Sequence, residues 1–463
     1  MDLSRVIYTS IVEVCPFLST RFESSALDFF FFYLFVFRFS HSFSPISTTI
    51  MPGPAVTPNK PSHRRRSSVT NALNQIPLNH EQGSSIQPAE VKPLTSRPRP
   101  KSKRSRDALP EIYNSNGFWD DIKTGRWMLI PSSSFKLMLV APILYLNHRL
   151  LVHYGVLGPD TPNIFEHLIF PSNRLPDGRY GKSWWDLVFM ANYVIFWSFV
   201  RQFMTLKVFR PMAMSLGIKG GKIMRFTEQG YAFFYFSILG SLGIYVMRGL
   251  PTWWYKTEHF WLEYPHREMT WELKTYYLVQ AAYWLQQTIL LAAKIEKPRK
   301  DFKELVAHHI VTLWLVGWSY NIYLTYIGVS IFVTMDVSDV FLALAKCVNY
   351  VSDFWSVPVF AWFIFVWSYF RHYLNIWILW SVWAQFDLIR PSERSAFDPL
   401  NDNWLSWWMK WQIFTPIFLL QLINLFWYFL IWRILVKAIF YRDLKDERSD
   451  DEEEEDEVKV KAE

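Results

Sequence analysis

The chain has 463 residues, of which 51% are hydrophobic and 19% aromatic, and it carries 48 Lys and Arg against 41 Asp and Glu for a formal net charge of +7. Because residues 450–457 form an unbroken run of eight acids, the rest of the chain is more basic than this net charge suggests. This division excludes a soluble enzyme with one core and a uniformly basic nucleic-acid binder, and two cysteines far apart in the sequence exclude a disulfide framework and a cysteine-based zinc site.

The N-terminal part of the chain has two different compositions. Residues 27–37 are apolar apart from Asp28, but this run is shorter than the about 20 residues that cross a bilayer. Met51 begins a polar stretch, so we interpret residues 1–50 as an upstream extension of the gene model. Residues 51–126 are rich in Pro, Ser, Lys and Arg without a hydrophobic period, which predicts a disordered, basic tail. Its basic clusters are compatible with docking on anionic lipid or nucleic acid, and a solvated cytosolic tail is the simpler interpretation.

From Ser134 to Phe440 the sequence predicts an all-α polytopic membrane protein. Apolar stretches of about 20 residues recur along this region, and each is long enough to cross a bilayer as a helix. We predict eight transmembrane helices, at residues 134–152, 184–206, 229–247, 274–293, 305–324, 326–346, 356–380 and 411–434.

Two of the connecting loops are strongly basic. Lys and Arg dominate the loop between the second and third spans and the loop between the fourth and fifth, whereas the other long loops mix signs or lean acidic. By the positive-inside rule both basic loops are cytosolic, so both termini are expected in the cytosol. Residues 127–225 therefore comprise the first two spans and a basic cytosolic loop.

The end of the chain, residues 441–463, is predicted to be an acidic cytosolic tail. Lys459 and Lys461 stand at the fifth and third positions from the end, as in a cytosolic dilysine retrieval signal, which predicts an endoplasmic reticulum membrane protein. Ser449 precedes the acids and resembles an acidophilic kinase site, and residues 65–68 resemble a basophilic one, which predicts a phosphoprotein.

Four ionisable residues lie inside the predicted spans: His308 and His309 in the fifth, and Asp336 and Asp339 in the sixth. An ionisable group at this depth costs about 2.5–3.5 kcal/mol on insertion scales, so each one indicates function. The two aspartates, three residues apart, share a helix face. His308 and Asp339 lie about 8 and 10 Å from the cytosolic ends of their helices, so antiparallel neighbours would bring them together in a site open to the cytosol. A His–Asp partnership suits nucleophilic or general-base chemistry.

Polar and basic groups are expected around this site. The fourth span carries Tyr, Gln and Trp at nearly every position from 276 to 287, which a lipid-facing helix does not need. The basic loops supply a rim fit for a polyphosphate group, made of Lys219, Lys222, Arg225, Lys297, Arg299, Lys300 and Lys303. The pattern predicts a site that admits a charged headgroup from the cytosol and a long chain from the bilayer.

The four ionisable residues allow other interpretations. A lone membrane histidine more often packs between helices or snorkels, but an adjacent pair at the depth of a same-face aspartate pair favours function. Dinuclear iron hydroxylases and desaturases need HxxxH or HxxHH clusters, which the eleven histidines do not form. We predict no metal, and a mononuclear site built from His308, His309 and one aspartate stays open as an alternative.

Residues 226–350 carry the motifs of a known family. The matching stretches are 261–266 (WLEYPH), 299–302 (RKDF), 308–312 (HHIVT), 336–339 (DVSD) and 346–350 (KCVNY), together with Lys274, Tyr276, Tyr277, Gln280, Tyr283, Trp284, Ser319, Tyr320 and Gly328. On these residues the chain resembles the longevity-assurance family of ceramide synthases, in the TLC-domain superfamily. The polar N-terminus and the absence of a homeobox-like insert are typical of the fungal form.

The resemblance implies a TLC-type catalytic domain at residues 226–440, with six helices, the third to the eighth, in a half-barrel around a central cavity. It implies transfer of a fatty acyl group to the amine of a sphingoid base, dihydrosphingosine or phytosphingosine, from acyl-CoA, which is a substrate and not a cofactor. We expect His308 to attack the thioester, and His309, Asp336 and Asp339 to orient the imidazoles and accept the proton of the amine. Substrate-binding roles are implied for Tyr276, Tyr277, Gln280, Tyr283, Trp284, Arg299, Lys300, Ser319, Tyr320, Lys346 and Asn349.

Some alternatives stay open within this resemblance. Direct attack by the amine, with the histidine pair as general base, is the other chemistry. A non-catalytic TLC-domain protein that binds or moves lipids is the other function, and the intact His-His and Asp-x-x-Asp motifs argue against it. In the family the loop before the last span, here residues 385–404, influences acyl chain length. The resemblance also suggests a small single-span regulatory subunit and a homo- or heterodimer, and no nucleic-acid partner.

Overall fold

The computed structural model describes residue 109 and residues 111–293, 302–395 and 397–440. The predictions for the extension at residues 1–50, for most of the tail at 51–126 and for the acidic end at 441–463 fall outside these residues. The kinase-type serines and the two lysines of the retrieval signal also lie there.

In the described part of the chain the regular secondary structure is helical, as predicted. The α-helices are α4 (Phe118–Lys123), α5 (Pro131–Met138), α6 (Val140–His153), α7 (Trp185–Phe203), α8 (Arg210–Ser215), α9 (Gly221–Arg248), α10 (Trp271–Ala292), α11 (Phe302–Asn321), α12 (Thr325–Val351), α13 (Asp353–Trp367), α14 (Asn375–Ala384) and α15 (Met409–Phe440). Two π-helices join neighbouring α-helices: η4 (Met204–Phe209) links α7 to α8, and η6 (Ser368–Leu374) links α13 to α14. Short 3-10 helices are η1 (Glu111–Tyr113), η2 (Arg126–Met128), η3 (Ile164–Leu168), η5 (Thr257–Phe260), η7 (Phe386–Leu388), η8 (Pro391–Arg394) and η9 (Pro399–Asn401). Within the described residues the β-structure amounts to isolated bridges, such as Tyr180 to Met269.

All eight ranges predicted as spans are occupied by helices. Five helical segments are long and apolar enough to cross a membrane: Pro131–His153, Trp185–Ser215, Gly221–Arg248, Thr325–Val351 and Met409–Val436. The other predicted spans lie in α10, in α11 and in the unit α13–η6–α14. Buried glutamines lower the apolar character of α10. The chain is therefore a polytopic membrane protein, and the count of eight spans stays a prediction.

The predicted tail is wrong at its C-terminal end, because residues 111–126 are folded. Ser115 Oγ and Ser133 Oγ each donate to Asp121 Oδ2 at 2.6 Å. Arg126 Nη2 donates to the carbonyl of Asn114 at 2.6 Å. This segment is too polar to fold alone, but here it binds the start of α5, whose Ser133 supplies one of these donors.

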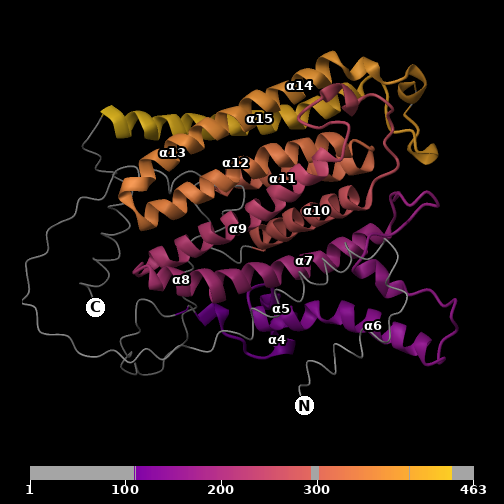
Figure 1. The fold of residues 1–463 in the computed structure, drawn as a ribbon, viewed down its shortest axis with the longest axis horizontal. Helices are drawn as coiled ribbons and strands as arrows, with labels where there is room; N and C mark the ends of the chain where they lie inside the picture. The colour runs from indigo at the N-terminus through magenta and orange to yellow at the C-terminus, as the bar shows by residue number, and fades with distance from the viewer. Residues whose placement is uncertain (1–108, 110, 294–301, 396, 441–463) are drawn as a thin grey trace, which may run out of the picture. The chain divides into compact units, whose positions relative to one another are not determined.

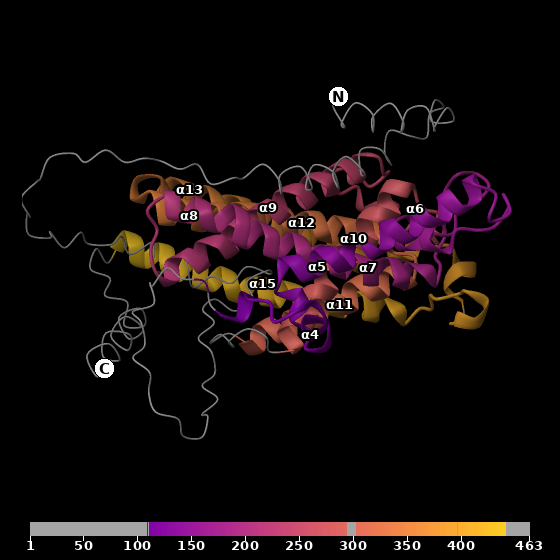
Figure 2. The ribbon, with the colours of Figure 1, turned by 90° about the horizontal axis from the view of Figure 1, so that it is seen from below.

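Six helices, which run lengthwise through the molecule in Figures 1 and 2, contact one another in a closed ring. The ring runs from α9 to α10, α11 and α15, then through α14 and η6 to α12, and from α12 back to α9. The N-terminal spans lie outside it, since α7 packs on α10 and α5 packs on α7. The ring corresponds to the six helices that the family resemblance assigns to a half-barrel around a cavity.

Glycines allow two close approaches inside this ring. A Cβ atom at Gly240 on α9 would lie 3.5 Å from Cβ of Asp336 on α12. A Cβ atom at Gly243, one turn later, would lie 2.5 Å from the hydroxyl oxygen of Tyr276. Small residues let membrane helices approach closely. These glycines therefore fix how Tyr276 and Asp336 sit between α9, α10 and α12.

A buried ion pair holds the N-terminal ends of α7 and α10 together. Lys274 Nζ lies 2.8 Å from Asp186 Oδ1, and both side chains are buried. The lysine also donates to the carbonyls of Ser172 and Gly181, and Tyr320 Oη donates to Asp186 Oδ2 at 2.7 Å. Because these partners satisfy both charges, the cluster is a structural anchor for α7, α10 and α11.

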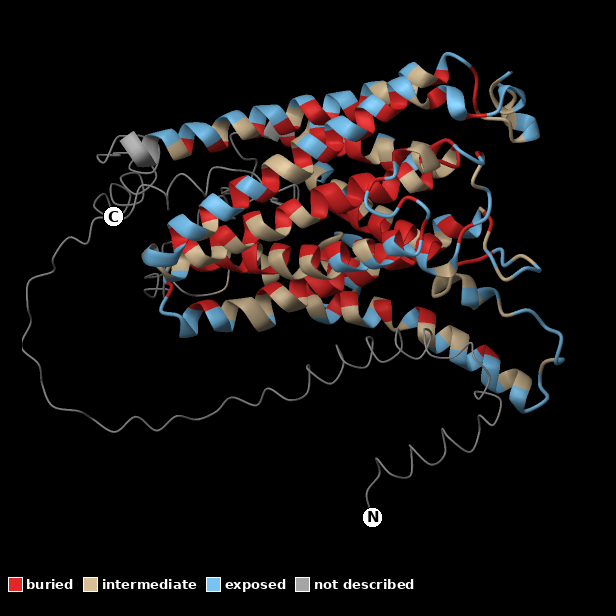
Figure 3. Cartoon of the chain, turned by 45° about the horizontal axis from the view of Figure 1, so that its top comes forward, coloured by how far each residue is buried: buried red, intermediate tan, exposed pale blue. Residues whose placement is uncertain are grey.

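Buried residues concentrate in the ring, whereas the outer faces of α13, α14 and α15 are exposed (Figure 3). Large apolar side chains stand on these outer faces, for example Trp362 at 53%, Phe365 at 63% and Trp380 at 44% exposure. Exposed apolar faces of this kind suit contact with lipid acyl chains and not with water.

Candidate active site

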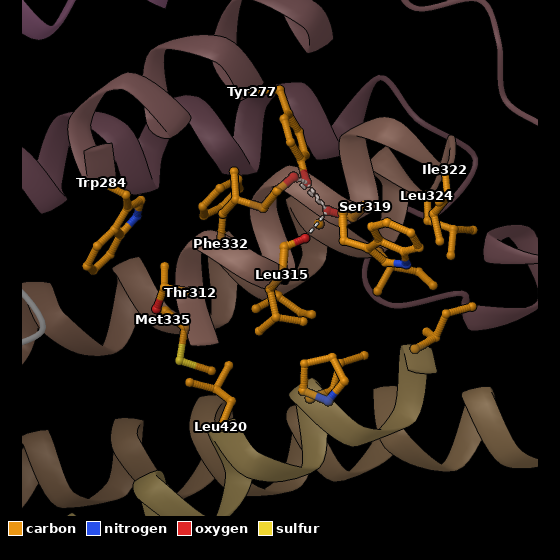
Figure 4. Close-up of a pocket in the computed structure, with 18 of the residues that line it drawn as sticks. Tyr277, Trp284, Thr312, Leu315, Ser319, Ile322, Leu324, Phe332, Met335 and Leu420 are labelled. Carbon is orange, nitrogen blue, oxygen red and sulfur yellow. Dashed lines mark hydrogen bonds between the residues drawn. The ribbon is translucent and has the colours of Figure 1, made fainter. Parts of the chain in front are cut away.

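A pocket opens inside the helix ring, between α10, α11, α12 and α15 (Figure 4). Its lining is largely apolar. The lining residues are Tyr277, Trp284, His308, Thr312, Leu315, Val316, Trp318, Ser319, Ile322, Leu324, Ile327, Gly328, Ile331, Phe332, Met335, Gln412, Ile413, Pro416, Ile417 and Leu420. One ionisable residue of the predicted catalytic set, His308, is among them.

The pocket is elongated along α11. It extends from His308 to Ile322, which at 1.5 Å per residue is a length of about 21 Å. Half of the about 30 Å hydrocarbon core, the depth of one lipid leaflet, is about 15 Å. An apolar channel of this length, with a histidine near one end, matches a long hydrocarbon chain whose reactive group lies at His308.

The two adjacent histidines are fully buried and are held by aromatic rings. His308 and His309 are each 1% exposed, and their ring centroids are 5.8 Å apart at 88°. Trp284 of α10 contacts both, with centroids 5.7 and 5.9 Å away, and Trp427 of α15 lies 5.5 Å from His308. The edge-to-face contacts of Trp284 and the tilted contact of Trp427 fix ring orientation without using the nitrogens.

Hydrogen bonds define which nitrogens remain available. Nδ1 of His309 donates to the carbonyl of Leu305 at 2.9 Å, so the neutral ring carries its lone pair on Nε2. Nε2 of His308 lies 3.3 Å from the hydroxyl of Thr312. His308 Nδ1 and His309 Nε2 are buried and have no hydrogen-bond partner among the described residues. Each imidazole thus keeps one buried nitrogen that no hydrogen bond within the described residues uses.

Asp336 ends a hydrogen-bonded chain across three helices. Gln280 Nε2 donates to Asp336 Oδ2 at 2.5 Å, and Tyr235 Oη of α9 donates to Gln280 Oε1 at 2.5 Å. The Gln280 amide also donates to Tyr276 Oη at 3.1 Å. In the part of the chain that the structure describes, Asp336 Oδ1 has no partner. One oxygen of this buried carboxyl is therefore positioned and the other is open.

Asp339 binds Arg371, a residue outside the predicted catalytic set. Arg371, in the π-helix η6, places Nη2 2.6 Å from Asp339 Oδ1, and both side chains are fully buried. Its Nε donates to Ser338 Oγ at 2.6 Å and its Nη1 to Asn424 Oδ1 at 3.0 Å. π-Helical turns occur frequently at functional sites. Arg371 lies within the predicted seventh span. Because a charged residue inside a membrane span is costly, its position in the sequence alone already indicates a functional residue.

The predicted meeting of the four ionisable residues is realised only in part. α11 contacts α12, and Met335, the neighbour of Asp336, lines the same pocket as His308. However, the hydrogen bonds of the imidazoles go to Leu305 and Thr312, while the carboxyls bind Gln280 and Arg371. The spacing that predicted a common depth does not specify these partners.

The residues with implied substrate-binding roles divide into three groups. Tyr277, Trp284 and Ser319 line the pocket, and the hydroxyls of Tyr277 and Ser319 bond each other (Figure 4). Tyr276, Gln280 and Tyr283 are buried beside it, with Tyr283 stacked on Tyr235. The pocket lining does not include Tyr320, Lys346 and Asn349: Tyr320 binds Asp186, and Asn349 accepts from Ser356 at the end of α12. Arg299 and Lys300 lie outside the described residues.

The far end of the pocket lies near a charged cluster in the loops. Trp318 lines the pocket, and its ring centroid is 6.3 Å from that of Trp404. The Trp404 indole donates to Asp402 Oδ1 at 2.8 Å, and Asp402 is 3.8 Å from Lys182. This cluster connects the loop before α15 to the pocket.

Among the residues described, no group of three or more His, Cys, Asp and Glu is arranged to hold a metal ion.

Comparison with known proteins identifies clear relatives. The family described as TLC domain matches residues 225–433. The sphingosine N-acyltransferase lac1 of Schizosaccharomyces pombe is 40% identical over 320 residues, which cover 68% of this chain and 82% of the relative. The ceramide synthase LAG1 of Saccharomyces cerevisiae is 41% identical over 305 residues, 65% of this chain and 74% of the relative. The sphingosine N-acyltransferase-like protein FUM17 of Gibberella moniliformis is 36% identical over 325 residues, 68% of this chain and 80% of the relative.

Proposed function

The chain belongs to the longevity-assurance family of ceramide synthases in its fungal form, and from this premise we propose that it acylates a sphingoid base through an acyl-histidine on His308. The family membership makes the protein an acyltransferase, with acyl-CoA and a sphingoid base as the substrate classes. The alternative of a non-catalytic TLC-domain protein that binds or moves lipids is disfavoured, because the relatives are named as acyltransferases or ceramide synthases. Dihydrosphingosine and phytosphingosine are the proposed acceptors.

One observation carries the covalent route. His308 lies in the wall of the apolar pocket and has a buried nitrogen, Nδ1, without a hydrogen-bond partner among the described residues. A histidine nitrogen with a lone pair is a competent nucleophile toward a thioester. An acyl chain that fills the channel along α11 brings its carbonyl carbon to this end of the pocket.

The first step is the transfer of the acyl group to the protein. A nitrogen of His308 attacks the thioester carbonyl carbon, the C–S bond breaks, and CoA leaves as the thiolate. Thr312, 3.3 Å from Nε2, and the rings of Trp284 and Trp427 hold the imidazole in place. Aromatic walls on this ring limit access of water to the acyl-imidazole.

The second step is the transfer to the amine. The amine nitrogen attacks the acyl-imidazole carbonyl, an amide forms, and the bond from the acyl carbon to His308 breaks. His309 Nε2 and Asp336 Oδ1 have no partner in the described part of the chain, so both are available to accept the proton that the amine loses. That proton balances the CoA thiolate released in the first step, and no cofactor is required. Asp339 and Arg371 contribute fixed charge beside this centre.

The cellular setting follows from the sequence patterns. Basic loops on the cytosolic side suit the phosphates of CoA, and the dilysine-type end suits residence in the endoplasmic reticulum membrane, with both termini in the cytosol. We extend the proposal to a single-span regulatory subunit or a second copy as partner, and to phosphorylation of the tails, as the family and the sequence suggest.

Intact-mass measurement tests the covalent route. Purified protein is incubated with acyl-CoA in the absence of a sphingoid base, beside His308→Ala and His309→Ala variants. We expect one acyl adduct on the wild type and on His309→Ala, and none on His308→Ala. Ceramide formation should fall by about 10²–10⁴ in each variant. An adduct that survives His308→Ala, or none on the wild type, rejects the acyl-histidine.

Direct attack of the amine on acyl-CoA is the second candidate chemistry. It is favoured by His309 Nε2, an open base at a buried site beside the pocket. It predicts ceramide formation without a mass adduct at any time before the base is added. Rapid-mixing experiments distinguish the two routes, because only the covalent route releases free CoA before the base arrives.

A further inference from the structure

A chain of polar side chains, called here the polar seam, joins η6 and α14 to α15. Its members are Ser368, His372, Asn375, Gln421 and Tyr428. Gln421 Nε2 donates to His372 Nδ1 at 2.8 Å, and Asn375 Nδ2 donates to Gln421 Oε1 at 2.7 Å. The hydroxyls of Ser368 and Tyr428 lie 2.8 Å apart. These residues lie inside the predicted seventh and eighth spans.

The polar seam ends in two groups without partners. Because His372 Nδ1 accepts from an amide, the neutral ring carries its proton on Nε2. This Nε2 donor and the Oδ1 acceptor of Asn375 are both buried and have no hydrogen-bond partner within the described residues, and Asn375 is fully buried. In a low-dielectric environment such groups are costly unless a ligand or water pairs with them. Polar side chains often hold membrane helices together by hydrogen bonds, which explains the two bonds of Gln421. It does not explain His372 Nε2 and Asn375 Oδ1, which have no partner within the described residues.

The polar seam lies next to the proposed nucleophile. Tyr428 contacts His372 with ring centroids 4.3 Å apart, and the preceding residue, Trp427, contacts His308 with centroids 5.5 Å apart. Consecutive residues on an α-helix point about 100° apart, so His308 and the polar seam contact adjacent faces of α15. Arg371, which precedes His372, reaches Asp339 on α12.

We propose that the polar seam binds the amino-alcohol head of the sphingoid base, which rests on the acyl-transfer function proposed above. A hydroxyl group both donates and accepts, so it can accept from His372 Nε2 and donate to Asn375 Oδ1. The surroundings suit a lipid: Tyr373 and Trp377, beside the polar seam, are 61% and 40% exposed on the outer face. A hydrocarbon tail lies against such a face while the amine turns toward His308. The acyl chain occupies the separate channel along α11.

Steady-state kinetics with both substrates test this site. His372→Phe keeps a ring against Tyr428 and removes the nitrogens, and Asn375→Leu removes the acceptor. We expect each variant to raise the KM for dihydrosphingosine about tenfold, because each loses one hydrogen bond to the substrate. The KM for acyl-CoA and the rate of adduct formation should stay unchanged. The matched control is Ser381→Ala in α14, whose hydroxyl donates only to the Ile378 carbonyl. This variant should retain wild-type values.

A substrate analogue separates binding from folding. For the wild type, a base that lacks one hydroxyl should have a KM about tenfold higher, whereas His372→Phe or Asn375→Leu should show little further loss with it. Equal losses with both bases, an unchanged KM for dihydrosphingosine, or slowed adduct formation would overturn the proposal. If no adduct forms on the wild type, only the acyl-histidine is lost, because KM values from ceramide formation still report the polar seam.

Discussion

Arg371 of η6 and Asp339 of α12 form an ion pair of 2.6 Å in which both side chains are fully buried. The guanidinium also binds Ser338 and Asn424 and lies 4.2 Å from the centre of the Trp367 ring. A buried pair with its remaining donors satisfied contributes little net stability but becomes costly when one partner is lost. The pair therefore ties the π-helix to the helix that carries both aspartates.

Arg371→Ala is expected to destabilise the protein by about 3–5 kcal/mol, because it leaves the Asp339 carboxylate buried without its cation. Thermal unfolding in detergent measures this, and ceramide formation should be lost with it. Arg371→Lys restores the positive charge but not the planar guanidinium with its several N–H donors. It should therefore recover part of the stability and part of the activity. The double variant Arg371→Met with Asp339→Leu should recover stability without activity. Recovery of both properties in the double variant would make the pair purely structural.

Gly328→Ala is expected to lower stability and activity together. A Cβ atom at Gly328 of α12 would collide with the hydroxyl end of Tyr277, which lines the pocket and bonds Ser319. Overpacking of this kind typically costs about 1–3 kcal/mol. Gly317→Ala is the matched control, because a Cβ atom there meets no atom within 4 Å and alanine favours the helix α11. Thermal unfolding should separate the two variants in opposite directions, and equal effects would contradict the close contact.

The helices were predictable because hydrophobic length directly encodes a span, and α9, α12 and α15 contain the predicted ranges, with α9 beginning eight residues earlier, at Gly221. The pocket residues His308 and Trp284 were also predictable, since polar groups in a span indicate a site. The partners were not: spacing gives the face and depth of Asp336 and Asp339 but not which neighbouring helix supplies the donor. Gln280 and Arg371 reach these aspartates only because the helices close into a ring.

Protonation of Asp402 is expected to weaken the fold at acid pH. Burial raises the pKa of this loop carboxyl, but hydrogen bonds from Tyr323 and Trp404 and the charges of Lys182 and Arg267 outweigh burial and lower the pKa below its ordinary value. A lowered folded-state pKa contributes stability that is present above the unfolded value of about 3.9 and lost as pH falls through the folded value. The thermal unfolding temperature should therefore decrease as pH falls below about 4. Asp402→Asn should lower the unfolding temperature at neutral pH and flatten this decrease, and an unchanged pH dependence would contradict it.

Trp318→Ala is expected to shift the products toward longer acyl chains. The Trp318 side chain lines the part of the pocket that lies away from His308, and it contacts Trp404 of the loop before α15. Its removal lengthens the apolar channel, and one methylene in a hydrophobic pocket is worth at least about tenfold in selectivity. Mass spectrometry of ceramides from a mixture of acyl-CoA lengths measures the ratio of longer to shorter products. Trp314→Ala removes an equal side chain from α11 outside the pocket lining, where Trp314 is 38% exposed, and should leave this ratio unchanged. Equal shifts in the two variants would mean that the pocket end does not set chain length.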